Sequence, residues 1–353
     1  MKNIIKIGFA TISLLALSAC SEGYIDDISQ VSAGDDKAAP TVEIMSPTGN
    51  IFIPSAVNSS NVNFQFKVAD DIEIGNVELL LDGKKLANYD EFIDYRIMNG
   101  SYNYNNLGIG NHTFTVNAKD LTGKTSTKSI SFSIDKYYKL LDSETFYVPF
   151  SAGNIFTDLI STNNLTIVGS PKTVAGGHIG SAYQGVTDSY LTYPIDNLFG
   201  TKELTLSFWY KVDVSQDRAG IVVVGDESET NNDDSRKKGF RLFREGTKTV
   251  KLNVGIGNGE SWNDGFNLGN NTGWVHIAVT ISETESKIYL NGVLQRTSTL
   301  SAPINFANCK NLTLGSGKPT FSYWDHFSDT SMIDEFRFFN KALTDSEIQT
   351  IMQ

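Results

Sequence analysis

The sequence predicts an all-β chain made of two consecutive β-sandwiches. From Thr41 onward, apolar and polar residues alternate over short runs such as VNFQFKVAD and LTLSFWYKV, which is the period of a half-buried strand. Turn residues separate these runs, and the dipeptides Asp82-Gly83 and Asn291-Gly292 favour two-residue hairpins. A helix signal stands near the C-terminus, where Thr344 and Glu347 have the spacing of a capping box.

Residues 1–19 precede the sandwiches and have the form of a secretory signal. Lys2 and Lys6 give a positive start, and the apolar run IGFATISLLAL is too short to span a bilayer. The ending Leu-Ser-Ala-Cys resembles the lipobox of bacterial lipoproteins, which implies that Cys20 is lipidated and becomes the first residue of the mature chain. The alternative is a plain cleaved signal with an incidental cysteine.

Residues 20–40 are predicted to be a flexible tether, because acidic pairs, serine, glycine and alanine leave little apolar material to bury. Acidic residues shortly after the lipidated cysteine look like the signal that exports some lipoproteins to the outer face of the Gram-negative outer membrane. We therefore expect a lipid-anchored protein at the outer membrane, facing the cell exterior. A generic acidic linker would have the same composition.

Residues 41–135 are predicted to form the first sandwich. Its six alternating runs are TVEIMSP, VNFQFKVAD, NVELLLDGKKL, YRIMNGSYNYN, HTFTVNAKD and TKSISFSID. The stretch GNHTFTVNAKDLTGKTSTKSISFSID resembles the last two strands of bacterial Ig-like domains. This resemblance implies an Ig-like β-sandwich, and such modules usually act as spacers.

Residues 136–353 are predicted to form the second sandwich. The blocks that define it are, in order, SAYQGVTDSYLTYP, LTLSFWYKV, GWVHIAVTIS, KIYLNGVL, LTLGSG and MIDEFRFFNKALTDSEIQTIM. Together they resemble the concanavalin A-like, laminin G type (LamG) family of secreted bacterial proteins. This resemblance implies a jelly-roll β-sandwich of two antiparallel sheets.

Composition excludes several classes of function. The net charge is −11 and the longest basic run is RKK, so nucleic acid is a poor partner. Two cysteines and four scattered histidines give neither a disulfide framework nor a zinc site. No paired-carboxylate, nucleophile-elbow or phosphate-loop motif is present, so we expect no enzyme activity. A glycoside hydrolase or lyase with an unrecognised site is the weaker alternative.

Two segments of the second sandwich, GESWNDGFNLGNN and GKPTFSYWDHFSD, combine aromatic rings with polar groups and are predicted to be loops. Such a composition suits a sugar, because rings pack on its CH face while amides and carboxylates bond its hydroxyls. Each aromatic ring could instead plug the core of its own domain. The predicted ligand-binding residues are Trp262, Tyr323 and Trp324 as a platform, with Asn263, Asp264, Asp325 and His326 as hydrogen-bonding groups.

Two further pairs have more than one interpretation. Trp209 and Trp274 fall in strand motifs shared across the resembled family, so packing is favoured over a ligand-binding sheet face. Asp334 lies among apolar neighbours and needs a partner for its carboxylate. A structural calcium shared with Asp188 is one interpretation, and a network of backbone donors is the other.

These features together predict a surface lipoprotein that binds polysaccharide or oligosaccharide through its LamG-type domain. We expect it to belong to a polysaccharide capture and uptake system, with an outer-membrane transporter as a further partner. The alternative is an adhesin or structural surface protein that contacts protein.

Overall fold

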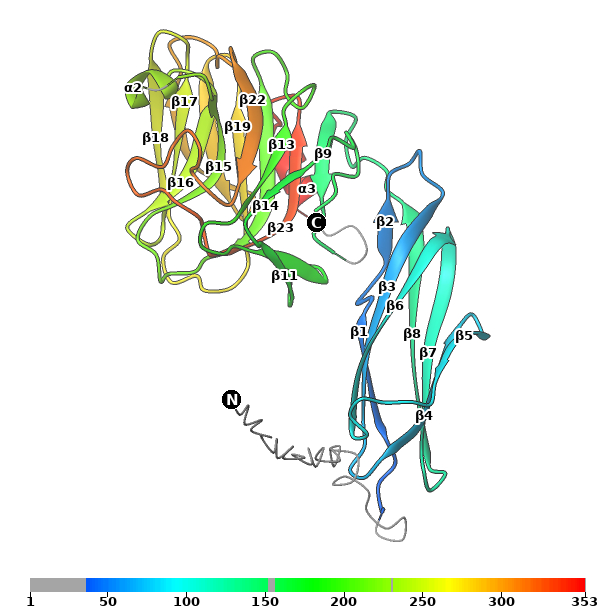
Figure 1. Ribbon diagram of the computed structural model, residues 1–353. Helices are drawn as coiled ribbons and strands as arrows, with labels where there is room; N and C mark the ends of the chain where they lie inside the picture. The colour runs from blue at the N-terminus through cyan, green and yellow to red at the C-terminus, as the bar shows by residue number, and fades with distance from the viewer. Residues whose placement is uncertain (1–35, 152–155, 230, 353) are drawn as a thin grey trace, which may run out of the picture. The chain divides into compact units, whose positions relative to one another are not determined.

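The computed structural model describes residues 36–151, 156–229 and 231–352. The predicted signal, most of the tether and Cys20 lie outside the described residues. Nearly all regular structure in the described part is β, which confirms the predicted fold class (Figure 1).

Two sheets form from the first predicted sandwich, in the strand orders β1-β3-β6 and β2-β8-β7-β4-β5. In β3 the alternation is complete, because Val62, Phe64 and Phe66 are buried while the residues between them are exposed. The predicted hairpin turn between β4 and β5 is present, with positive φ at Asp82 and Gly83. The strands are β1 (Thr41–Ser46), β2 (Ile51–Ile53), β3 (Ser59–Ala69), β4 (Ile74–Leu81), β5 (Lys84–Tyr89), β6 (Ile97–Gly108), β7 (Gly110–Asp120) and β8 (Thr125–Lys136).

The chain divides into two compact units, and the division passes through the long strands of these sheets. The first unit holds Lys67–Gly100 and Thr115–Lys128 with the described residues before Ile44. The second unit holds Ile44–Phe66, Ser101–Phe114 and Ser129–Gln353. The predicted domain boundary near residue 135 stays a prediction, since this division does not fall there.

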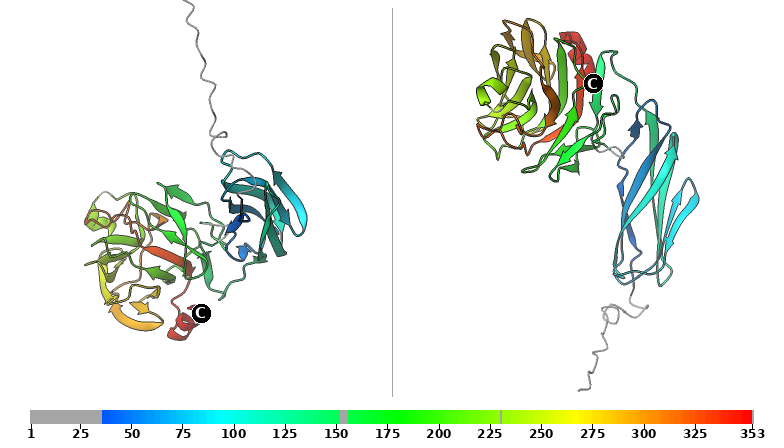
Figure 2. Two further views of the ribbon diagram at one scale, coloured as in Figure 1. Left: turned by 90° about the horizontal axis from the view of Figure 1, so that it is seen from below. Right: turned by 45° about the horizontal axis from the view of Figure 1, so that its top comes forward.

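The remaining strands build the second sandwich, in which two antiparallel sheets enclose one apolar core (Figures 1 and 2). One sheet has seven strands in the order β10-β13-β22-β15-β16-β17-β18. The other has eight, in the order β11-β12-β23-β14-β19-β20-β21 with β9 also paired to β23. The strands are β9 (Glu144–Val148), β10 (Thr166–Val168), β11 (Lys172–Ala175), β12 (Ser181–Gln184), β13 (Tyr190–Pro194), β14 (Leu204–Lys211), β15 (Ala219–Asp226), β16 (Phe240–Glu245), β17 (Thr249–Gly255), β18 (Glu260–Asn267), β19 (Val275–Ile281), β20 (Glu285–Leu290), β21 (Val293–Thr299), β22 (Cys309–Leu314) and β23 (Met332–Phe339).

Helix α3 (Asp345–Ile351) covers part of the outer face of the eight-stranded sheet. It starts at the predicted capping box, in which Thr344 and Glu347 bond each other's backbone N–H groups. Its buried Ile348 and Ile351 pack in one cluster with Tyr289 of β20. No helix in the described part of the chain is long and apolar enough to cross a membrane.

A buried ion pair connects β16 to the segment before β23. Arg244 of β16 and Asp329 are both fully buried, with Nη2 of Arg244 3.6 Å from Oδ1 of Asp329. The hydroxyl of Tyr210 donates to Asp329 Oδ2 at 2.7 Å, and Arg244 also donates to the carbonyls of Gln216 and Thr247. The pair therefore joins the seven-stranded sheet to the segment that precedes β23.

Replacing Asp329 by Ala should destabilise the second sandwich by about 3 to 5 kcal/mol, because it leaves the Arg244 guanidinium buried without its counterion. Denaturant unfolding followed by tryptophan fluorescence measures this loss. Asp325→Asn is the control, since Asp325 is exposed on the same segment and Asn tolerates its left-handed backbone. Equal stability of the two variants would contradict the anchoring role of the pair.

Candidate functional site

The outer face of the seven-stranded sheet carries a small apolar cluster. In β16, Phe240 and Leu242 face the core between the sheets, so the alternate residue Phe243 faces outward. Phe243 packs with Val223 of β15 and with Phe321, and all three side chains are buried. The outer face of the sheet thus provides apolar side chains against which residues of another segment can pack.

Residues 315–331, which connect β22 to β23, fold onto this cluster. The N–H of Gly317 donates to the carbonyl of His326 at 3.0 Å, and the N–H of Phe321 donates to the carbonyl of Gly317 at 2.6 Å. A Cβ at position 317 would lie 2.0 Å from the His326 carbonyl oxygen, so this close approach requires glycine. Phe321 is the buried anchor of the segment, stacked 4.6 Å from the His326 ring.

Two partly exposed tryptophans pack against this apolar cluster. Trp262 of β18 is 37% exposed and Trp324 is 40% exposed, and their ring centroids lie 6.2 Å apart. Tyr323 meets Trp324 edge to face at 5.2 Å, and Trp262 meets Phe243 in the same way at 6.0 Å. We call Trp262, Tyr323 and Trp324 the aromatic platform.

Arg236 holds the platform from one side. Its guanidinium carbon lies 4.6 Å from the centroid of the Trp324 ring and 5.7 Å from that of Tyr323, and its Nη1 donates to the Tyr323 hydroxyl at 3.0 Å. Cation–π contacts are worth about 0.5 to 2 kcal/mol, with the larger values at desolvated sites. Because the Arg236 side chain is almost fully buried, we expect a value toward the upper end.

Acidic groups fix the orientation of this arginine. Nε of Arg236 donates to Glu260 at 2.9 Å, and Nη2 donates to Asp233 at 2.7 Å. Asp233 lies in the short helix α2 (Asn232–Ser235), whose N-cap Asn231 accepts the Asp233 N–H. Burial alone would lower the pKa of Arg236, but the hydrogen bonds to Tyr323, Glu260 and Asp233 raise it. Arg236 therefore carries a positive charge, which the carboxylates of Asp233 and Glu260 balance.

The structure brings together the predicted platform residues Trp262, Tyr323 and Trp324, which the sequence placed in two separate segments. Asp325 follows directly and is exposed. Its left-handed backbone, with φ of 62°, turns the chain so that Trp324 points outward while His326 points inward. Asp325 is thus an exposed polar residue next to Trp324.

Of the other predicted polar groups, Asn263 and His326 point inward, whereas Asp264 is exposed on the same side of β18 as Trp262. Glu260–Asn267 is a strand rather than the expected loop, so alternation turns Asn263 away from Trp262 and into the core, where it donates to the Ser286 carbonyl at 3.2 Å. Asp264 forms an ion pair with Arg296 of β21 at 3.2 Å. His326 is fully buried among aromatic rings. Asn263 and His326 are therefore buried beneath this surface.

Trp209 and Trp274 agree with the packing interpretation. The Trp209 ring stacks on His178 with centroids 3.5 Å apart, and Trp274 Nε1 donates to the Gly176 carbonyl at 3.3 Å. His276, beside Trp209, is buried and bonds Ser207 at 2.8 Å. The short segment between β11 and β12 thus covers both indoles.

The suggested calcium pair of Asp334 and Asp188 is not supported by the geometry. Asp188 is exposed and pairs with Lys318 at 2.9 Å. Asp334 is fully buried, and its carboxylate accepts the N–H groups of Ile179 and Glu335, each at 2.9 Å. Burial raises the pKa of Asp334 to about 8. The surroundings of Asp334 agree with the alternative interpretation, in which backbone N–H groups satisfy its carboxyl group.

Sequence reasoning missed the residues that support the platform. In the sequence Arg236 stands out only as part of a basic run, and its contact with Tyr323 spans 87 positions, which no local pattern reveals. Phe243 could have been found, because alternation in FRLFRE sets it opposite Phe240 and Leu242. No sequence pattern marks Glu260, since it contributes to the platform only by accepting a hydrogen bond from Arg236.

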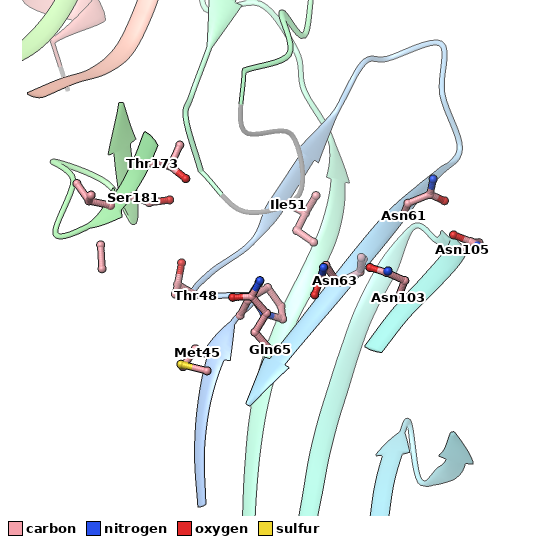
Figure 3. A pocket seen from close by; sticks show the side chains of 15 residues that line it. Met45, Thr48, Ile51, Asn61, Asn63, Gln65, Asn103, Asn105, Thr173 and Ser181 are labelled. Carbon is pink, nitrogen blue, oxygen red and sulfur yellow. The ribbon is translucent and has the colours of Figure 1, made fainter. Parts of the chain in front are cut away.

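A second polar surface lies on the β1-β3-β6 sheet (Figure 3). The amides Asn61, Asn63 and Gln65 of β3 lie beside Asn103 and Asn105 of β6. Asn63 is already bonded by the Ser101 hydroxyl at 3.0 Å. The residues that line this surface include no aromatic side chain on which a sugar ring could stack. The aromatic platform is therefore the stronger candidate site.

Part of the second sandwich matches a known protein family. Residues 185–349 match the concanavalin A-like lectin/glucanases superfamily. No curated protein matches the chain. Among solved structures, domain 4 of AbnA, a GH43 extracellular arabinanase from Geobacillus stearothermophilus in complex with arabinotriose, is 20% identical over 60% of this chain and 100% of that one, with a TM-score of 0.45.

Binding domains of botulinum neurotoxins are also similar to this chain. The binding domain of botulinum neurotoxin DC in complex with rat synaptotagmin II is 14% identical over 61% of this chain, with a TM-score of 0.46. That of serotype D is 15% identical over 60% of this chain, with a TM-score of 0.45. This chain spans about half the length of those toxin domains.

The burial of His326 predicts a pH dependence of stability. Burial lowers the pKa of His326 to about 4, whereas histidine in an unfolded chain titrates near 6.5. Between these values the unfolded chain binds more protons than the folded one, so stability falls as the pH drops from about 6.5 toward 4. His326→Phe keeps a ring against Phe321 but cannot be protonated. Its Tm should therefore fall less between pH 7 and pH 5 than that of the wild type, and an equal fall would contradict the assignment.

Proposed function

We propose, on the premise that residues 185–349 form a concanavalin A-like domain, that this chain is a surface-anchored lipoprotein that binds glycan through its aromatic platform. The observation that carries the proposal is the convergence of two partly exposed indoles, Trp262 and Trp324, on one braced surface. In this proposal the protein sits at the outer membrane, captures polysaccharide for an uptake system with a transporter partner, and performs no catalysis of its own.

The chemistry of the platform suits a sugar. An indole face packs against the apolar CH groups of a sugar ring, and stacking adds about 0.5 to 1.5 kcal/mol per aromatic pair beyond area burial. The exposed carboxylate of Asp325 stands next to Trp324 and can accept hydrogen bonds from sugar hydroxyls. Apolar faces flanked by a few polar groups are the usual composition of a small-molecule site.

The platform is also held in place before a ligand arrives. Arg236 lies against Trp324 and bonds Tyr323, while Phe321 anchors the segment in the sheet. Ordering a mobile side chain on binding costs about 0.5 to 1.5 kcal/mol, and a braced ring avoids most of that cost. A platform of this size gives modest affinity for one site, and several anchored copies on one polymer raise the overall avidity.

Replacing either Trp262 or Trp324 by Ala should weaken glycan binding about tenfold, because one lost stacking contact is close to the 1.4 kcal/mol that make a decade of affinity. A glycan array identifies the ligand, and affinity gel electrophoresis then compares the variants. Tyr138→Ala is the matched control, since its ring is 72% exposed and lies outside the platform.

Thermal melts first establish that the tryptophan variants are folded. Full binding by both variants would exclude the platform as the site. Failure of the wild type to bind any polysaccharide would favour the alternative of an adhesin or structural protein that contacts protein.

The proposed lipid anchor at Cys20 can be tested separately from glycan binding. Cys20→Ala should move the protein from the membrane fraction to the soluble fraction, because two or more acyl chains hold a protein firmly at about 0.8 kcal/mol per buried CH₂. Fractionation of expressing Gram-negative cells with immunoblotting measures the change, and Cys309→Ala is the control. Membrane retention of the Cys20 variant would argue against lipidation.

A further inference from the structure

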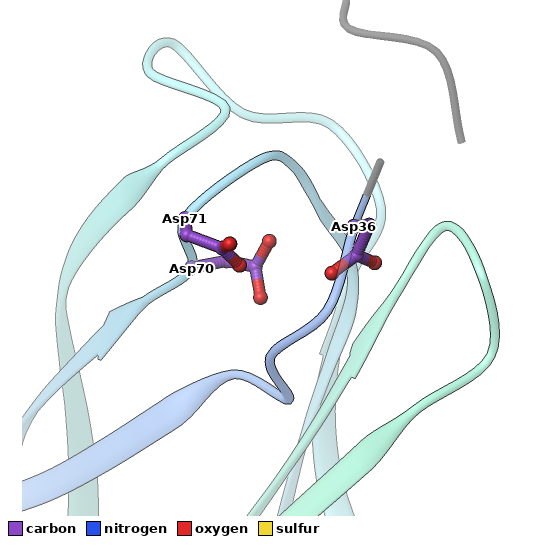
Figure 4. A group of neighbouring side chains, drawn as sticks. All are labelled: Asp36, Asp70 and Asp71. Atoms are coloured by element: carbon purple, nitrogen blue, oxygen red, sulfur yellow. The ribbon is translucent and has the colours of Figure 1, made fainter. Parts of the chain in front are cut away.

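Three aspartate side chains meet at one end of the first compact unit. Asp36 precedes β1, and Asp70 and Asp71 follow directly after the end of β3. Each offers a carboxylate oxygen, and these oxygens lie within 4.8 Å of one another. Figure 4 shows the three side chains turned toward a common space. Within the described part of the chain, no other set of three or more Asp, Glu, His or Cys residues places its ligand atoms close enough together to share one ion.

Buried carboxylate oxygens in this group lack hydrogen-bond partners. Asp70 is only 8% exposed, and its Oδ1 accepts the N–H groups of Ile72 and Glu73 at 3.0 and 2.8 Å. Its Oδ2 is buried without a hydrogen-bond partner. The Asp36 side chain is 2% exposed, and its Oδ1 is likewise buried and unpartnered. Leaving one such oxygen dehydrated costs free energy, and two from distant parts of the chain point to a shared ligand.

The charges nearby do not balance. Lys124 lies 2.8 Å from Asp36 Oδ2 and 3.6 Å from Asp120 Oδ2, which is also buried without a hydrogen-bond partner. Lys124 thus pairs with Asp36 and Asp120, and no ion pair joins Asp70 or Asp71 to another described residue, so the carboxylates near Asp36 outnumber the paired lysine. Carboxylates held this close repel one another unless a further cation lies between them.

We propose that Asp36, Asp70 and Asp71 bind a calcium ion. All the offered ligands are carboxylate oxygens, which select a hard cation over zinc or copper. Calcium binds oxygen at about 2.3 to 2.6 Å, so ligands on opposite sides of the ion lie about 5 Å apart. The spread of these three oxygens fits that shell, and exposed Asp71 leaves room for water to complete six to eight ligands.

The ion would fasten the start of the described chain to the body of this unit. Asp36 also accepts a hydrogen bond from Thr122, in the turn between β7 and β8, at 2.7 Å. Calcium would thus join three segments that are far apart in sequence: the residues before β1, the β3–β4 turn and, through Asp36, the β7–β8 turn. The position at which the predicted tether leaves the sandwich would then depend on calcium.

Calorimetric titration of the purified full chain with CaCl₂, after removal of metal with EDTA, tests the site. We expect one saturable site, affinity at least tenfold weaker in Asp71→Asn, and unchanged affinity in the control Asp264→Asn. Asp71 is exposed, so its variant should fold normally. Calcium should also raise the Tm of the wild type more than magnesium does, since magnesium keeps its waters.

Two results would overturn the proposal: no saturable calcium binding by the wild type, or unchanged affinity in Asp71→Asn. Trypsin gives an independent measure, because Lys37 is adjacent to Asp36. Calcium should slow cleavage after Lys37 in the wild type but not in Asp71→Asn, with cleavage after exposed Lys139 as the internal reference. Equal cleavage after Lys37 with and without calcium in the wild type would remove Asp36 from the site.

Discussion

The aromatic platform depends on the buried contact between Arg244 and Asp329. Arg244 points into the core from β16, the strand whose neighbouring residue Phe243 supports the platform on the outer face. Asp329 lies near the end of the 315–331 segment that carries Trp324. One ion pair therefore fixes both the strand and the segment. A buried pair adds little stability over apolar residues of the same volume, but it is costly to break, which favours a single arrangement of the segment.

Local chemistry made much of the fold predictable. Alternation, the two hairpin dipeptides and the capping box act over a few residues, so they can be recognised in the sequence. The convergence of Trp262 with Trp324 was also expected, because both segments belong to one sandwich. The inward direction of Asn263 was not predictable in this way, since the sequence predicts a loop where Glu260–Asn267 is a strand, and the inward direction of His326 depends on the turn at Asp325. The contacts of Arg236 and the closeness of Asp36 to Asp70 depend on long-range packing that no local pattern encodes.

The two candidate sites are built in different ways. The platform is braced by groups that satisfy one another, as Arg236 does with Asp233 and Glu260. The acidic group at Asp36 and Asp70 is incomplete, because buried oxygens there have no protein partner. A satisfied site is rigid and ready for weak, reversible contacts, whereas an unsatisfied one gains stability when its missing ligand arrives.

The pairing of Arg236 also bears on which polymers the surface would accept. Its positive charge is balanced by two carboxylates, so it offers little attraction to an anionic ligand. Asp325 beside the platform and the net charge of −11 add repulsion. Uronic-acid-rich or sulfated chains would therefore approach slowly and be held poorly, while uncharged chains would meet no such barrier. Selection by charge would thus come before any recognition of linkage or ring stereochemistry.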